Sequence, residues 1–391
     1  MFAVFRRLRN PMRGMGLGLA AALGLAACDS VPMAGGNAGP GVARDAPVTV
    51  AMLVPQSAAG GGDIVARSLE NAARLAVSDL QGARIDLRVY DTGGDAGVAA
   101  AAANRAVAEG ADVIVGPLYT QSASAIVPAV AGRDISVLSF SNNTAVAGGN
   151  VFVLGQTFQN VANRLTEYAS GQGRGSVAVV HSADLAGDAG RDAIVAAAQR
   201  SGMTVATVQS YPLSSQGISS AGPRIARAIQ ETGADSVFLT ANVDTDLPMI
   251  AGTLSENEVS PSQVRYLGLT RWNAASQALS LPALQGGLFT LPDQNVLSQF
   301  ENRYQAAYGE APHPLAGLGY DAIQAVGSLV ADGRSLAPAS FTQTDGFSGA
   351  YGVFRLLQGG TNQRALAVAQ IQNSQVVVLD PAPRRFGGGL F

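Results

Sequence analysis

The chain has 391 residues, which is enough for two domains of ordinary size, and 47% of them are apolar whereas 14% are charged. Its net charge of −3 argues against a nucleic-acid partner, because the phosphate backbone is bound by basic surfaces. A single cysteine excludes an internal disulfide, and the apolar content is sufficient for a large buried core.

The first 27 residues have the layout of a secretory signal peptide. Four arginines, the last of them Arg13, precede an apolar run over residues 15–27 that is too short for a comfortable membrane span. An uncleaved N-terminal anchor is the alternative. Residues 28–46 are rich in Gly, Pro and Ala without periodicity, which predicts a flexible tether.

From Val48 onward, apolar runs typical of buried strands alternate with helical patterns. Strands are expected at residues 48–55, 84–91, 111–117 and 135–141, and helices at 63–80, 96–110 and 120–132. A helix between successive strands gives βαβ units, so these residues predict a mostly parallel sheet. We assign residues 47–156 to this first lobe.

The alternation restarts after a short strand at 151–155 and a helix near 157–170. Further strands are expected at 176–182, 204–212, 235–241, 265–270 and 286–292, with helices at 189–202, 222–233 and 245–257. This pattern predicts a second doubly wound lobe over residues 157–294.

The C-terminal third breaks the alternation. Two helices, at 295–309 and 317–333, follow each other without a strand between them, and a second lobe that included them would be oversized. The polarity then alternates and turns at Gly359 and Gly360, as in a hairpin. We expect the chain to return to the first lobe over about 295–345 and to form hairpin strands near the hinge over 346–380. Residues 381–391 are expected to be a loose tail.

Several segments, taken in order, match one known family. They include NAARLAVSDL (71–80), IDLRVYDTGGD (85–95), GADVIVGP (110–117), GADSVFLTA (233–241) and FENRYQAAYGEAPHPLAGLGYDAIQAV (300–326). Together they resemble the type 1 periplasmic binding proteins, in particular those for leucine, isoleucine and valine. The resemblance implies an α/β fold of two doubly wound parallel-sheet lobes joined by three crossovers. It also implies a non-enzymatic protein that holds a small amino-acid-like ligand between the lobes and serves an ABC permease.

The resemblance points to ligand contacts in loops that follow strands, where open parallel sheets bind their ligands. These candidates are Ser57, Thr120, Ser122, Ser141 and Asn143 in the first lobe and Asp244 in the second. Thr120 or Ser122 would bind a ligand carboxylate, and Asp244 would hold an ammonium group. Each residue also has a plainer interpretation as a loop residue or a helix cap, as does Asp63 after the first strand.

A second resemblance leads to a different function. VIVGPLYTQ (113–121), LTRWNAA (269–275) and GLGYDAI (317–323) are similar to penicillin-binding protein activators of the LpoA type. In that interpretation Arg271 and Trp272 are surface contacts for a penicillin-binding protein. The alternative is that these side chains pack locally within their loop.

The segment LAAC (25–28) resembles the bacterial lipobox. The resemblance implies cleavage before Cys28 and acylation of this residue, and several acyl chains exceed the threshold for stable anchoring. We therefore predict a protein held at the periplasmic face of a bacterial membrane. The Asp29 that follows leaves inner and outer membrane open.

Residues typical of an enzyme do not assemble into a site. His181 and His313 lie far apart, and neither has the spacing of a metal-ligand cluster. GISSAG (217–222) lacks the final glycine of a nucleophile elbow, and GQGRGS (171–176) precedes a strand whereas a phosphate loop follows one. We expect no catalytic residue, cofactor or metal.

Overall fold

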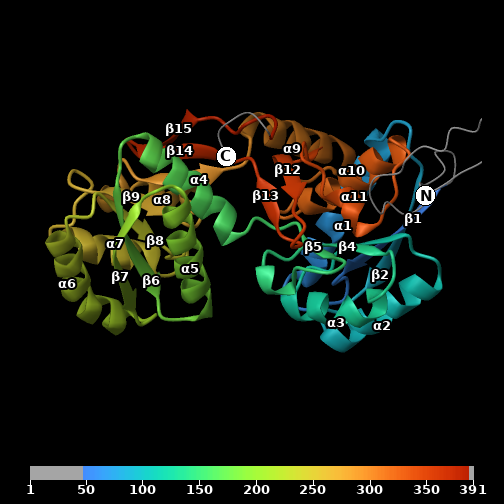
Figure 1. The fold of residues 1–391 in the computed structure, drawn as a ribbon, viewed down its shortest axis with the longest axis horizontal. Coiled ribbons are helices and arrows are strands. Elements are labelled where there is room, and N and C mark those ends of the chain that lie inside the picture. The colour runs from blue at the N-terminus through green and yellow to red at the C-terminus, as the bar shows by residue number, and fades with distance from the viewer. Residues whose placement is uncertain (1–46, 387–391) are drawn as a thin grey trace, which may run out of the picture. The chain divides into compact units, whose positions relative to one another are not determined.

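The computed structural model describes residues 47–386, which form three sheets with their covering helices (Figure 1). The expected signal peptide, Cys28 and the tether lie outside the described residues. The first sheet is parallel, the second is mostly parallel with two antiparallel strands at one edge, and the third is a small antiparallel sheet.

The first lobe contains a five-stranded parallel sheet in the order β2-β1-β3-β4-β5. Its strands are β1 Val48–Val54, β2 Ile85–Asp91, β3 Val113–Val115, β4 Ser136–Ser139 and β5 Val151–Val153, and its helices are α1 Gly62–Asp79, α2 Ala96–Ala108 and α3 Thr120–Val130. Successive side chains of a strand point to opposite faces. Accordingly Val50 and Met52 pack in the cluster that holds α1, whereas Ala51 and Leu53 pack with α2 and α3.

The second lobe contains a seven-stranded sheet in the order β15-β14-β10-β9-β8-β6-β7. Its strands are β6 Ser176–Ser182, β7 Thr204–Tyr211, β8 Ser236–Leu239, β9 Arg265–Gly268, β10 Leu288–Leu291, β14 Ala367–Gln372 and β15 Gln375–Asp380. Its helices are α4 Phe158–Gly171, α5 Leu185–Arg200, α6 Ser215–Thr232, α7 Leu247–Glu256 and α8 Ser276–Leu279. The strands β6 to β10 are parallel, and β14 and β15 add to them in antiparallel orientation.

Three helices follow β10: α9 Gln294–Tyr308, α10 Gly317–Ala331 and α11 Pro338–Phe341. Helix α10 packs against α1 and shares the apolar cluster of the first sheet, on the face opposite α2 and α3 (Figure 1). The third sheet consists of β11 Phe347–Gly349, β12 Gly352–Leu356 and β13 Asn362–Arg364. Residues 346–380, for which the sequence predicts hairpin strands near the hinge, are therefore divided between this sheet and that of the second lobe.

The chain passes between the two lobes three times, after β5, after β10 and after β13. Residues of β13, just before the third passage, hydrogen-bond to the first passage. Arg364 donates two hydrogen bonds to the carbonyl of Leu154, at 2.9 and 2.6 Å, and Asn362 donates to the carbonyls of Val153 and Gly155. The prediction of two doubly wound lobes joined by three crossovers is confirmed.

Two helices of the second lobe begin earlier than the sequence predicts. Helix α5 begins at Leu185, because the side chain of Asp184 accepts a hydrogen bond from the N–H of Gly187. Ser214 caps α6 in the same way through Gly217. The segment GISSAG therefore lies inside a helix, which excludes a strand-to-helix nucleophile elbow at this point.

Candidate functional site

A cavity of about 550 Å³ lies between the two lobes, and we call it the cleft. Its walls include residues that follow the carboxyl ends of strands in both sheets: Leu118 after β3, Phe140 after β4, Gly155 after β5, Arg271 after β9 and Pro292 after β10. Loops at this edge of a parallel sheet are the usual place for a ligand. Residues of the linking segments, such as Arg364 and Leu366, also line the cleft.

One wall of the cleft is the N-terminus of α3. The residue that precedes this helix, Tyr119, makes no side-chain cap, and Thr120 is already the first helical residue. The hydroxyl of Thr120 lies 3.4 Å from that of Ser141, and both residues line the cleft. Because the first N–H groups of a helix have no partner within it, this end of α3 favours an anion.

The other first-lobe candidates lie outside the cleft wall. Ser122 is fully buried in α3, and its hydroxyl has no hydrogen-bond partner among the described residues. Asn143 caps a short 3₁₀ helix at Thr144–Val146 by accepting from the N–H of Ala145 at 3.0 Å. Its neighbour Asn142 lines the cleft in its place.

Ser57 is hydrogen-bonded to the carboxylate of Asp91 in its own lobe. Its N–H donates to Oδ1 of Asp91 at 3.2 Å. Burial acts to raise the pKa of Asp91, but hydrogen bonds from the Ser57 hydroxyl and from nearby backbone N–H groups outweigh it and lower this pKa. The first helical residues follow Gly61, so Asp63 lies in the first turn of α1 and does not cap it.

In the second lobe the buried acid is Asp246, not Asp244. Asp246 accepts hydrogen bonds from the hydroxyl of Tyr211 and from the N–H of Asn242, the latter at 2.7 Å. Burial, followed by the hydrogen bond to Asp246, raises the pKa of Tyr211. Asp244 is exposed and does not line the cleft, and none of the described residues that do line it is a carboxylate that could bind an ammonium group.

Arg271 and Tyr351 line the cleft, and neither was among the residues proposed as ligand contacts. The sequence leaves open whether Arg271 and Trp272 are surface contacts for a partner or pack locally within their loop. The surface interpretation is wrong for Trp272, which is fully buried in the core of the second lobe, with its ring centroid 5.9 Å from that of Phe289. A charged residue just beyond the carboxyl end of a parallel strand is the signal that could have identified Arg271.

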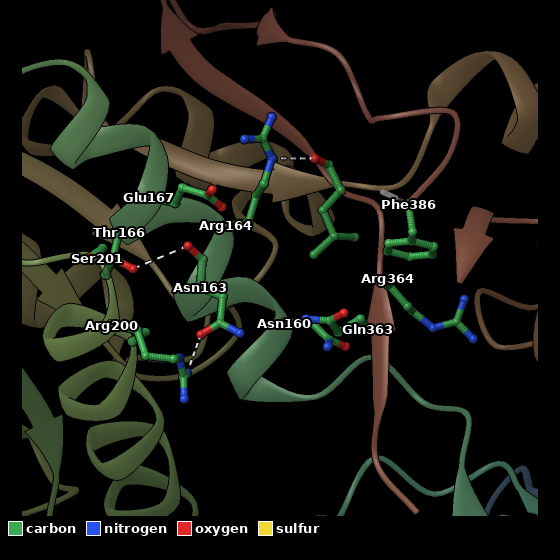
Figure 2. Close-up of a pocket in the computed structure, with 12 residues that line it drawn as sticks. Asn160, Asn163, Arg164, Thr166, Glu167, Arg200, Ser201, Gln363, Arg364 and Phe386 are labelled. Atoms are coloured by element: carbon green, nitrogen blue, oxygen red, sulfur yellow. Dashed lines mark hydrogen bonds between the residues drawn. The ribbon is translucent and has the colours of Figure 1, made fainter. Parts of the chain in front are cut away.

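A second cavity, of about 350 Å³, lies between α4, the end of α5 and β13 (Figure 2). Its arginines are already paired. Arg164 forms an ion pair with Asp380 at 2.6 Å, and Figure 2 shows Arg200 turned toward the side chain of Asn163, to which it donates a hydrogen bond. The second cavity therefore differs from the cleft, where Arg271 has no hydrogen-bond or ion-pair partner among the described residues.

The two histidines serve structural contacts. Nδ1 of His181 lies 3.0 Å from the carbonyl oxygen of Ser182, and Nδ1 of His313 accepts from the N–H of Leu315 at 3.1 Å. Burial lowers the pKa of His313. Within residues 47–386, no group of three or more His, Cys, Asp or Glu side chains is arranged to hold a metal ion.

Two doubly wound lobes, three linking segments and a cleft walled by both lobes define a two-lobed ligand-binding protein. The family model of the periplasmic binding proteins matches residues 47–375. The chain therefore belongs to the periplasmic binding protein family.

Solved structures share this fold at low sequence identity. A candidate branched-chain amino acid ABC transporter protein from Rhodospirillum rubrum has a TM-score of 0.71 at 17% identity, over 85% of this chain and 100% of its own. An ABC transporter substrate-binding protein from Desulfitobacterium hafniense, in complex with Leu, has a TM-score of 0.61 at 16% identity over 85% and 100%. A solute-binding protein from R. palustris, in complex with benzoate, has a TM-score of 0.57 at 18% identity, over 88% of this chain and 99% of its own.

A curated relative covers a smaller part of the chain. An uncharacterized protein of Rickettsia prowazekii is 28% identical over 121 residues. The match spans about a third of each protein, at 31% of this chain and 32% of the relative.

Proposed function

We propose that this protein is the solute-binding component of an ABC importer and holds a small amino-acid-like ligand in the cleft by its carboxylate. The observation that carries the proposal is the cleft wall itself, where the hydroxyls of Thr120 and Ser141 lie beside an uncapped helix N-terminus. Hydroxyls and free N–H groups are donors suited to a carboxylate. The complexes of structural relatives with Leu and with benzoate support a ligand that carries this group.

The proposed action is binding without chemical conversion. A ligand that contacts both lobes can do so only when the lobes are closed, so its binding favours the closed conformation of the protein. Membership of the periplasmic binding protein family supports a location outside the cytoplasm. A lipid on Cys28 would keep the protein near a permease, and no helix within residues 47–386 is long and apolar enough to cross a membrane.

Thermal shift and calorimetry with a panel of leucine, isoleucine, valine and benzoate test the proposal. A ligand at 100 times its Kd stabilises the folded state by about 2.7 kcal/mol, which raises the melting temperature measurably. For a probe that binds, Thr120→Val should weaken affinity about 10- to 100-fold, because one hydrogen bond to a charged group is lost.

Thr204→Val is the matched control, because Thr204 is exposed on β7. It should leave affinity unchanged. Absence of binding by the wild-type protein across the panel would contradict the proposed function. Equal affinity of the Thr120→Val variant and the wild type would remove Thr120 from the site.

A further inference from the structure

The cleft wall carries one cation that the described residues do not neutralise. The guanidinium of Arg271 has no hydrogen-bond or ion-pair partner within residues 47–386, and its Nε is shielded from solvent. The other cleft arginine, Arg364, forms a buried ion pair with Asp321 at 2.8 Å. Among the described residues that line the cleft there is no Asp or Glu, so the uncompensated charge there is positive.

The residues on either side of Arg271 hold it in position. The hydroxyl of Thr270 donates to the carbonyl of Ala241 at 2.9 Å. Trp272 is fully buried, and its indole fills the space beside Gly268 and Gly287, where a Cβ atom would overlap with the ring. The backbone on both sides of Arg271 is therefore anchored in the second-lobe core, which fixes the point from which its side chain reaches the cleft.

Arg271 acts electrostatically on the same cavity as the first-lobe hydroxyls. Burial and the charge of Asp321 raise the pKa of Tyr351, whereas Arg364 and Arg271 act in the opposite direction, so Arg271 lies within electrostatic range of this phenol. Tyr351, Thr120 and Arg271 all line the cleft. One anion in this cavity can therefore interact with both lobes.

We propose that Arg271 binds the negatively charged group of the ligand from the second lobe and makes the cleft selective for carboxylates over neutral ligands of the same shape. This inference rests on the proposed function and identifies its specificity-determining residue. A planar guanidinium matches a carboxylate with two parallel hydrogen bonds, and partial exclusion of water strengthens the attraction. An anion held between Arg271 and Thr120 favours the closed lobes.

Calorimetric titration of leucine against leucinamide, and of benzoate against benzamide, tests this role in Arg271→Gln and Arg271→Lys variants. The wild type should bind an acid about 10- to 100-fold more tightly than its amide. Arg271→Gln should weaken acid binding by a similar factor and reduce the preference for acid over amide. Arg271→Lys keeps the positive charge but loses the planar pair of N–H donors, so its affinity for the acids should lie between those of the wild type and Arg271→Gln.

Arg227→Gln is the control, because Arg227 is an exposed arginine of α6 in the same lobe and is not part of the cleft wall. It should bind as the wild type does. If Arg271→Gln retains wild-type affinity and wild-type acid preference, the inference fails while the proposed function stands. If the wild type binds none of the four probes, the proposed function fails together with the inference.

Discussion

Asp321 and Arg364 form an ion pair whose side chains are 0% and 4% exposed, at the point where the linking segments meet the first lobe. Asp321 also accepts a hydrogen bond from the N–H of Ala350 at 2.7 Å, and Arg364 donates to the carbonyl of Leu154. Both charges are thus fully engaged. Such a pair adds little net stability, but loss of one partner leaves the other buried and uncompensated.

Asp321→Asn should therefore destabilise the protein by about 3–5 kcal/mol, because the charge of Arg364 remains buried without its counter-ion. Urea unfolding followed by circular dichroism measures the change. Asp192→Asn is the control, since the side chain of Asp192 is 72% exposed in its pair with Arg191 and contributes little. Equal losses in the two variants would contradict the role assigned to Asp321.

At the scale of elements, the packing of α10 against α1 depends on small residues. A Cβ atom at Gly319 of α10 would overlap with the backbone carbonyl of Leu69 in α1. Glycine allows the helices to approach closely, and this contact covers one face of the first sheet. Gly187 and Gly217 look like helix breakers in the sequence, but they lie in the first turns of α5 and α6, where close neighbours exclude a larger side chain.

Gly319→Ala should cost about 1–3 kcal/mol, because the added methyl group overpacks a rigid backbone contact. Gly252→Ala in α7 provides a control of opposite sign. No atom lies within 4 Å of the Cβ position at Gly252, so alanine should stabilise this helix by about 0.5–1 kcal/mol. Denaturant unfolding of both variants checks the pair, and equal effects would rule out the packing argument.

At the scale of the whole molecule, three linking segments join the two lobes, and residues of both lobes line the cleft. Leu185, which is 91% exposed at the start of α5, lies at the carboxyl edge of the second sheet together with Arg271. Apolar and charged groups exposed at this edge are available to a ligand once the lobes close.

If Cys28 is acylated as the lipobox resemblance implies, Cys28→Ser should abolish acylation, because the thiol proposed to accept the lipid is absent. Labelling of cells with a radioactive fatty acid should mark the wild type and not the variant, and the variant should leave the membrane fraction. Thr204→Val, which keeps Cys28, should be labelled and membrane-bound. Membrane retention of an unlabelled Cys28→Ser variant would show that another feature anchors the protein.

Much of the fold follows from local patterns. Apolar runs and helical periodicity over Val48 to Leu291 predict most strands and helices of both lobes in their observed order. The short helix α8 was not predicted, α5 and α6 begin earlier than expected, and α7 begins two residues later. For the site, the sequence predicts the loops that follow strands, and Thr120 and Ser141 lie together in the cleft. Ser57, Asn143 and Asp244 have the right residue types, but their positions in the fold commit them to other contacts or to solvent.

The sequence by itself determined the alternating architecture, because the period of apolar residues records which face of each element is buried. Only the tertiary structure decided that Arg271 lines the cleft without a partner among residues 47–386, that Arg364 is neutralised by Asp321, and that Trp272 is buried. Charge balance in a cavity depends on groups far apart in the chain. Their approach is set by the packing of two lobes, which no local pattern encodes.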